Sequence, residues 1–197
     1  MLPQRQTLRR RRAPPPSAHA VEMAGTYRRR LITLRDGREV TFFAIAYADA
    51  TEIVQAFERL SAQSRYYRFM RHKRQLDDAA LQRGVHPRLG RDFVFVATIP
   101  ARDTIDIVGA AQYVRAKRRS SKTCEFAITV AEDWRGSGLA QKLLASLVRR
   151  ARHDGYRKME GPVIADNVPM LALARKLKFT VHRVPDDATV VQVQRTL

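Results

Sequence analysis

The second half of the chain alternates between two patterns of apolar residues. Short apolar runs typical of strands occur at residues 124–130, 158–164, 179–184 and 190–193. Between them, residues 137–152 and 168–177 show the spacing of amphipathic helices. In the longer helix one face carries five apolar residues, Leu139, Leu143, Leu144, Leu147 and Val148. The alternation predicts an α/β or α+β fold, with one mixed, twisted sheet and helices packed on both of its faces.

The first half of the chain is less regular but adds strands to the same sheet. Two β-rich runs, 31–34 and 40–45, flank Asp36-Gly37, a dipeptide typical of hairpins. Further strands are expected at residues 93–99 and 105–114. Between these pairs, the pattern predicts a helix from Asp49 (its N-cap) to Leu60, a turn or second helix at 61–70, a polar helical stretch near 76–82, and a loop at 84–90.

The first 30 residues show neither pattern. They contain eight arginines and a single acid, and Pro14, Pro15 and Pro16 oppose helix formation. We therefore expect residues 1–27 to be a disordered Arg/Pro-rich tail and residues 28–197 to form a single domain. A secretory signal is not expected, because no apolar core follows the arginines. A solvated tail or a mis-assigned start codon is preferred to a mitochondrial address, since three prolines would interrupt an amphipathic helix.

The charge of the chain bears on its partners. Lys and Arg number 37 against 19 Asp and Glu, which gives a net charge of +18. Such a balance favours polyanionic partners, such as nucleic acid, an acidic membrane surface or a highly charged cofactor. Nucleic acid binding through the basic tail is not favoured. The aromatic residues that alternate with cations in residues 65–74 are expected to pack in the core, with the cations facing water.

Other classes of protein are excluded by what the sequence lacks. No apolar run of about 18 residues is present, so no transmembrane span is expected. The single cysteine, Cys124, excludes an intramolecular disulfide and is expected to be a buried strand residue in a cytoplasmic protein. The five histidines show no spacing typical of metal ligands, so no metal is predicted.

One junction in the second half carries a chemical signal. At residues 130–140 an expected strand ends, a loop with Gly136 and Gly138 follows, and the long helix begins. The glycines let the backbone approach a ligand closely, and the amide groups at the start of the helix attract a diphosphate. A Walker loop is excluded because no Gly-Lys-Ser/Thr follows, and the third small residue of a dinucleotide-binding loop is absent. A plain tight turn between strand and helix is the alternative.

The residues of this junction resemble a known signature. The pattern R/Q-x-x-G-x-G/A, typical of the GNAT superfamily of acyl-CoA-dependent N-acetyltransferases, is similar to Arg135-Gly136-Ser137-Gly138-Leu139-Ala140. A second segment, from Asn167 to Phe179, resembles the later helix of the superfamily and follows at a matching distance. The resemblance covers roughly residues 30–197. It implies a GNAT-like fold and an acyltransferase activity with acetyl-CoA as co-substrate.

The closer similarity is to the acetyltransferase domain of bacterial Pat-type protein lysine acetyltransferases. It rests on residues 60–69, 125–130 and 167–177. Two positions depart from the superfamily pattern. Lys178 stands where a glycine is usual, and Ala174 stands where many members carry a tyrosine that protonates the leaving thiolate.

The resemblance implies a set of residues that bind acetyl-CoA. The pantetheine arm would pair with the strand at Ile128, Thr129 and Val130, and Asn167 and Met170 would contact it from the later helix. The pyrophosphate would lie on the loop and the helix start, formed by Arg135, Gly136, Ser137, Gly138, Leu139 and Ala140. A backbone N–H near residues 128–130 would polarise the thioester carbonyl.

The resemblance also implies a general base and an acceptor. Pat-type enzymes carry their catalytic glutamate at the position of Glu125, near the start of the expected strand 124–130. Partial burial in the cleft would raise the pKa of its carboxyl and improve it as a base; a plain surface carboxylate is the alternative. A protein lysine is the favoured acceptor, and a small-molecule amine comes second. A catalytically weak acyl-CoA-binding or nucleic-acid-associated module is the alternative outside the enzyme class.

Overall fold

The computed structural model describes residues 29–44, 50–77, 79, 81, 91–101, 105–116 and 122–197. Outside these residues lie the expected tail at 1–27, the expected N-cap Asp49, the loop at 84–90 and part of the polar stretch near 76–82. The division of the chain into a tail and one domain therefore stays a prediction.

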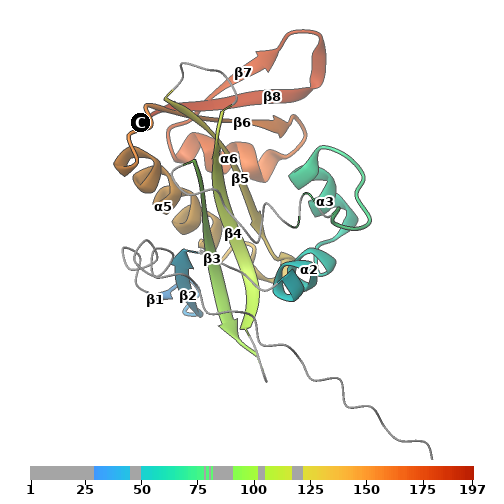
Figure 1. Ribbon diagram of the computed structural model, residues 1–197. Coiled ribbons are helices and arrows are strands. Elements are labelled where there is room, and N and C mark those ends of the chain that lie inside the picture. The colour runs from blue at the N-terminus through green and yellow to red at the C-terminus, as the bar shows by residue number, and fades with distance from the viewer. Residues whose placement is uncertain are drawn as a thin grey trace, which may run out of the picture.

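A mixed sheet forms the centre of the described part. Its strands are β1 (Arg30–Thr33), β2 (Glu39–Ala44), β3 (Asp92–Pro100), β4 (Ile105–Arg115), β5 (Thr123–Val130), β6 (Lys158–Ile164), β7 (Thr180–Val184) and β8 (Asp187–Thr196). They lie in the order β1-β2-β3-β4-β5-β6-β8-β7 (Figure 1). β5 and β6 are parallel and the other neighbours are antiparallel, so the predicted mixed sheet is confirmed.

Helices cover both faces of this sheet, as predicted. They are α2 (Ala50–Glu58), α3 (Ala62–Phe69), α5 (Leu139–His153) and α6 (Val168–Lys176). α5 buries its predicted apolar face in the larger core cluster, where Leu143 and Leu147 are fully buried. On the opposite face, Ile53 and Ala56 of α2 pack on a smaller cluster that includes Val96. Figure 1 shows α5 on one side of the central strands, and α2 and α3 on the other.

β5 and β6 separate after a short paired stretch. They pair over Thr123–Glu125 and Lys158–Glu160. One residue further on, a Cβ on Gly161 would stand 3.0 Å from the carbonyl oxygen of Phe126, so any larger residue would require the two strands to shift apart. In the described residues, β5 from Phe126 onward has no strand partner on the side of β6. The sheet therefore opens in its middle, and one edge of β5 faces the opening.

The end of α6 shows how the chain accommodates Lys178. This residue has a φ of 62°, the left-handed conformation that glycine adopts most readily. The Lys178 N–H donates to the Arg175 carbonyl and the Phe179 N–H to the Ala174 carbonyl, both at 2.9 Å. The helix thus ends in a left-handed turn without the usual glycine. Ala174 is fully buried and provides no hydroxyl group.

Two elements refine the predicted bounds. β8 is longer than the strand predicted at 190–193, because it pairs with β6 along one edge and with β7 along the other. The segment 61–70, predicted as a turn or a helix, forms α3. Its N-cap is Ser61, whose Oγ accepts a hydrogen bond from the Ser64 N–H at 3.1 Å.

Two expectations about side chains have different outcomes. Cys124 is fully buried, and burial raises the pKa of its thiol to about 12, which confirms a structural strand residue. The segment 65–74 is only partly as expected. Its aromatic residues are half-buried rather than buried, and the side chain of Lys73 is just 7% exposed. The reason is an ion pair between Lys73 and Asp77, which keeps this cation out of water.

Candidate functional site

The loop between β5 and α5 has the backbone geometry that its motif predicts. Gly136 and Gly138 have φ values of 76° and 89°, which residues with a Cβ rarely adopt. Among the described residues, a Cβ on Gly136 would meet no atom within 4 Å, and one on Gly138 would meet only the Arg35 Cβ at 3.7 Å. Gly138 stands at the N-cap position of α5 and has no side chain that could cap the helix, so among the described residues the Leu139 N–H alone of the first helical amides is assigned a side-chain acceptor, Ser137 Oγ. The loop and the helix start therefore leave open space next to backbone amides, as an anion-binding site requires.

Ser137 has a different role from its neighbours. Its side chain is 1% exposed and points into the protein. The hydroxyl donates to the Trp134 carbonyl at 2.7 Å and accepts from the Leu139 N–H at 3.2 Å. Ser137 thus holds the loop against the start of α5, with its side chain turned away from the open space.

A cleft of about 750 Å³ opens where β5 and β6 separate, with this loop along one side. The structure brings eleven of the twelve predicted site residues together in its lining: Glu125, Ile128, Thr129, Val130, Arg135, Gly136, Gly138, Leu139, Ala140, Asn167 and Met170. Ser137 is the twelfth. A volume of this size lies within the range of about 300–1,000 Å³ that small-molecule pockets usually have.

Asn167 lies in the cleft and also caps α6. Its Oδ1 accepts a hydrogen bond from the Met170 N–H at 3.2 Å. Val168 and Pro169 then occupy the first helical turn, where a missing proline N–H costs nothing. The same residue therefore starts the helix and presents its side chain to the cleft.

Glu125 lies where β5 and β6 separate. It is the last residue of β5 in register with β6, opposite Glu160, and on its other side it is opposite Val114 of β4. Its side chain lines the cleft and is exposed, so it does not have the partial burial that would make it a better base. The structure thus leaves the position of Glu125, rather than its burial, as the argument for a catalytic role.

Arg35 is a cleft residue that the sequence pattern did not indicate. It lies in the turn between β1 and β2, and its guanidinium donates to the Gly136 carbonyl at 2.8 Å. Its own N–H donates to the Ser137 carbonyl at 3.1 Å. Because Arg35 and Gly136 are 101 residues apart in the sequence, no local motif could reveal this contact. Ser64, Tyr67 and Lys176 are among the other lining residues that the sequence pattern did not indicate.

Glu132 connects the loop to α3. One of its oxygens, Oε1, accepts from the Ser61 N–H at 3.0 Å and from the Ser64 hydroxyl at 2.6 Å. The Arg135 guanidinium donates to the same Ser64 hydroxyl. Burial by itself would raise the pKa of Glu132, but the hydrogen bonds from Ser61 and Ser64 outweigh it and lower the pKa to about 2. A permanently charged carboxylate therefore fixes the start of α3 beside the glycine loop.

Comparison with known proteins agrees with this arrangement. The family model of the acetyltransferase (GNAT) family matches residues 54–179, which include β5, the glycine loop, α5 and α6. The chain belongs to the GNAT family. It is therefore an acyltransferase that uses acetyl-CoA as co-substrate, and the glycine loop, the uncapped start of α5 and the cleft fit that molecule.

Individual relatives show how far the likeness extends. Acetyltransferase PA5475 of Pseudomonas aeruginosa is 31% identical over 159 residues, which make up 81% of this chain and 84% of that protein. The crystal structure of the GNAT domain of S. lividans PAT has a TM-score of 0.76 at 24% identity and covers 92% of this chain and 99% of that one. The structure of yncA, a putative acetyltransferase from Salmonella typhimurium with its cofactor acetyl-CoA, has a TM-score of 0.57 at 22% identity, covering 79% and 94%. These two structures share the fold of this chain.

A membrane-spanning helix or a metal site would indicate other kinds of function. Among the described residues, no helix is both long and apolar enough to cross a membrane. Within the same residues, no group of three or more His, Cys, Asp or Glu side chains is arranged to hold a metal ion.

Proposed function

We propose that this GNAT protein transfers the acetyl group of acetyl-CoA to the ε-amino group of a protein lysine, with Glu125 as general base. One observation carries the assignment of the base. Among the described residues that line the cleft, Glu125 is the sole acid, and no histidine is present. It also lies at the separation of β5 and β6, next to the edge of β5 that the pantetheine arm would use.

The chemistry explains why a base is useful. The neutral amine nitrogen attacks the carbonyl carbon of the thioester, and the bond from that carbon to sulfur breaks. CoA leaves as a thiolate, and the proton that the nitrogen releases as the amide forms converts this thiolate to the thiol. A lysine with a pKa of about 10.4 is almost entirely protonated at neutral pH, and the protonated form has no lone pair for the attack. The Glu125 carboxylate accepts the proton of the amine, directly or through one water. Backbone N–H groups of β5 near Ile128 to Val130 polarise the carbonyl.

The remaining predicted residues hold the co-substrate. We assign the pyrophosphate to the amides of the glycine loop and the start of α5, with the Arg35 guanidinium beside them. Support for this role of Arg35 is its place in the cleft lining and its hydrogen bond to the Gly136 carbonyl. We assign the pantetheine arm to the free edge of β5, flanked by Asn167 and Met170.

A protein lysine is proposed as acceptor because of the Pat-type similarity. Three segments of the sequence resemble that domain, and the fold matches the GNAT domain of S. lividans PAT over nearly its whole length. A small-molecule amine is the second candidate. It is favoured by a further cavity of about 360 Å³ beside the cleft, a size that suits a small ligand. The cytoplasm stays our proposed location.

The experiment is an acceptor screen with isotope-labelled acetyl-CoA. The full chain is incubated with a panel of lysine-containing proteins and, in parallel, with small primary amines, and mass spectrometry locates the label. We expect label on lysine Nε atoms with the native chain and far less with Glu125→Gln. Label on small amines alone would contradict the protein acceptor, and equal labelling by both proteins would contradict the role of Glu125.

A further inference from the structure

The second cavity, of about 360 Å³, lies between α2, α3 and the sheet and is continuous with the cofactor cleft. The two share five lining residues, Arg68, Phe69, Gln112, Ala127 and Thr129. Side chains alternate along a strand, so Ala127 and Thr129 lie on the same face of β5 as Glu125. A group that occupies the second cavity is therefore on the face of the sheet where the proposed base accepts its proton.

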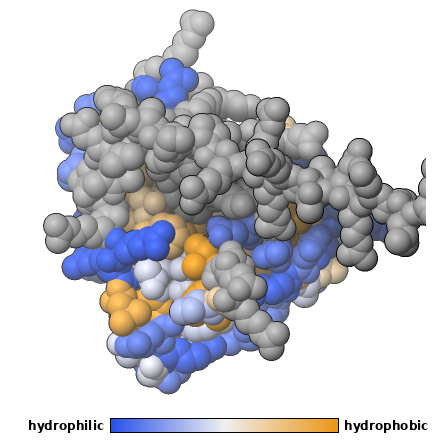
Figure 2. Space-filling view, turned by 60° about the horizontal axis from the view of Figure 1, so that its bottom comes forward, coloured by the Kyte–Doolittle hydropathy of each residue, from blue (hydrophilic) through white to orange (hydrophobic). Residues whose placement is uncertain are grey.

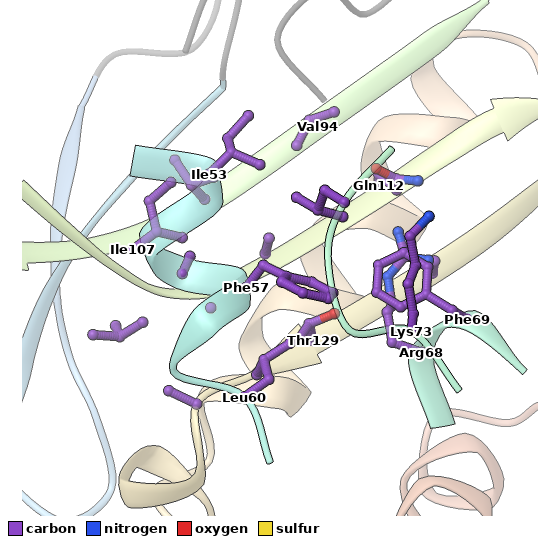
Figure 3. Close-up of a pocket in the computed structure, with 18 of the residues that line it drawn as sticks. Ile53, Phe57, Leu60, Arg68, Phe69, Lys73, Val94, Ile107, Gln112 and Thr129 are labelled. Carbon is purple, nitrogen blue, oxygen red and sulfur yellow. The ribbon is translucent and has the colours of Figure 1, made fainter. Parts of the chain in front are cut away.

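One wall of this cavity is apolar. It is formed by α2 and by the neighbouring strands, through Ile53, Ala56, Phe57, Leu60, Val94, Val96 and Ile107. Figure 3 shows Ile53, Phe57 and Ile107 gathered at α2, with Thr129 of β5 close to the Phe57 ring. An aliphatic or aromatic side chain placed against this wall buries apolar surface, which favours binding.

The opposite wall is cationic. Arg68, Arg71 and Lys73 line it, and Figure 3 shows Arg68 and Lys73 together on the far side of the cavity from Ile53. The Lys73 Nζ lies 2.5 Å from Oδ2 of Asp77 and 5.1 Å from the centre of the Phe69 ring. Arg71 lies 3.3 Å from the same Asp77 oxygen and is 65% exposed. Arg71 and Lys73 share this one carboxylate, and the described lining residues include no other acid. Three cations against one carboxylate leave this wall net positive, so it attracts a further carboxylate.

The surface at one end of the molecule is mixed in hydropathy. Figure 2 views the end that lies at the bottom of Figure 1, and its uncovered surface is mostly hydrophilic. Apolar residues gather there in a small area with hydrophilic residues around it. In the second cavity, an acceptor that meets the apolar wall and the cationic wall gains apolar contact and charge complementarity together.

We infer that the second cavity selects the acceptor lysine by its neighbours: it takes a large apolar side chain on the α2 wall and an acidic side chain on the cationic wall. This inference rests on the proposed function, because both side chains belong to the segment that delivers the lysine to Glu125. From Glu125 to Thr129 the strand advances by about 13 Å, at about 3.3 Å per residue. An extended acceptor segment covers that distance in about four residues, so both neighbours lie within about four positions of the lysine.

The test is a library of single-lysine peptides, assayed with the full chain and acetyl-CoA. Leucine and aspartate are placed at each position within four residues of the lysine, and the best peptide is compared with its Leu→Ser, Asp→Asn and doubly changed forms. We expect kcat/KM to fall about tenfold or more for the leucine change, since about 1.4 kcal/mol corresponds to tenfold. The aspartate change should cost about fivefold, and added salt should reduce its effect.

Variants of the chain test which wall of the cavity causes each preference. Ala56→Trp fills the apolar side and should remove the leucine preference, while Gln55→Trp, on the neighbouring exposed residue of α2, should keep it. Arg71→Gln should weaken the aspartate preference, while Arg74→Gln, an exposed cation outside the cavity lining, should not. All four variants should bind acetyl-CoA like the native chain, because none of these residues lines the cofactor cleft.

The outcomes separate this inference from the proposed function. Peptides that are acetylated at equal rates, whatever their neighbours, overturn the inference and leave lysine acetylation standing. Preferences that persist in both Ala56→Trp and Arg71→Gln also overturn it. If small amines are acetylated and no peptide is, both the protein acceptor and the inference fail.

Discussion

The proposed cofactor half and the proposed acceptor half of the site are built in different ways. The cofactor half, which consists of the glycine loop with the starts of α5 and α6, is shaped by backbone conformation and by a helix whose leucines are fully buried. The acceptor half, which consists of α2, α3 and residues 70–77, is shaped by side chains that are mostly half-buried. We propose that backbone geometry holds the co-substrate and that side chains select the acceptor. The proposed division of chemical roles thus follows the difference in packing.

Glu132 is one of the contacts between the two halves, together with Arg135. It follows β5 on the cofactor side and holds Ser61 and Ser64 of the acceptor side. The position of α3, which contributes Arg68 and Phe69 to both cavities, therefore depends on the loop that binds the co-substrate.

The largest expected effect comes from a charge in the cofactor half. Gly138→Glu places a carboxylate beside the pyrophosphate and forces a residue with a Cβ to a φ of 89°. We expect the Kd for acetyl-CoA to rise by about 100-fold or more, since like-charge contact costs several kcal/mol. Isothermal calorimetry measures this change.

The matched control is Gly155→Glu. Gly155 has a φ of 80° and open space around its Cβ position, but it follows the far end of α5 and is not part of the cleft lining. Gly155→Glu therefore introduces a similar backbone strain but places no charge in the cleft. Equal loss of acetyl-CoA binding in both variants would show that the backbone strain, and not the site, is responsible.

A smaller effect is expected where the two halves meet. Glu132→Gln removes a carboxylate whose pKa is lowered to about 2. A lowered pKa stabilises the fold above the ordinary pKa of about 4.3, and this stabilisation is lost as pH falls toward 2. At pH 6 we expect the variant to melt about 2–4 °C below the native chain, which corresponds to about 1 kcal/mol, and the gap to shrink by pH 3.

The measurement is the melting temperature at pH 6, 4 and 3, with Glu58→Gln, an exposed carboxylate of α2, as the control. A gap between Glu132→Gln and the native chain that is the same at all three pH values would contradict the role of the charged carboxylate.

The smallest effect is expected at the end of α6. Lys178→Gly removes the strain of a residue with a Cβ at a left-handed φ of 62°. The greater freedom of glycine in the unfolded chain partly offsets this gain in stability. We expect a gain in the free energy of unfolding of about 0.5–1 kcal/mol, visible as a rise of about 2 °C in melting temperature. Lys178→Ala keeps the Cβ and should show no gain. A gain of the same size for Lys178→Ala would trace the effect to the lysine side chain rather than to the backbone.

The sequence predicts the cofactor half well for a physical reason. Gly136, Gly138 and the leucines of α5 act through local backbone freedom and helical spacing, and both can be recognised within a few residues of sequence. Asn167 was recognised through the family resemblance, and its cap on α6 is also a local interaction.

The acceptor half is poorly predicted because its contacts join distant segments. Ser64 meets Glu132 across 68 residues. The cofactor half has one such contact as well, since Arg35 reaches the glycine loop across 101 residues, and it was missed for the same reason. Lys73 was expected to face water. Its pairing with Asp77 is local, four residues along the chain, but the burial of the ammonium depends on the tertiary packing around it. Ser137 shows that a motif can place a residue correctly without telling which way its side chain points.

The most direct test of the central claim, that Glu125 is the base where the two halves meet, is the pH profile of turnover for Glu125→Gln on a responsive lysine substrate. We predict that kcat falls by about 10²–10⁴-fold at pH 7 with the Kd for acetyl-CoA unchanged, and that higher pH restores part of the rate by supplying neutral amine. Glu160→Gln is the control, because Glu160 is the register partner of Glu125 but lies outside the cleft lining and pairs with Lys158 at 2.7 Å. Near-native turnover of Glu125→Gln at pH 7 would contradict the claim.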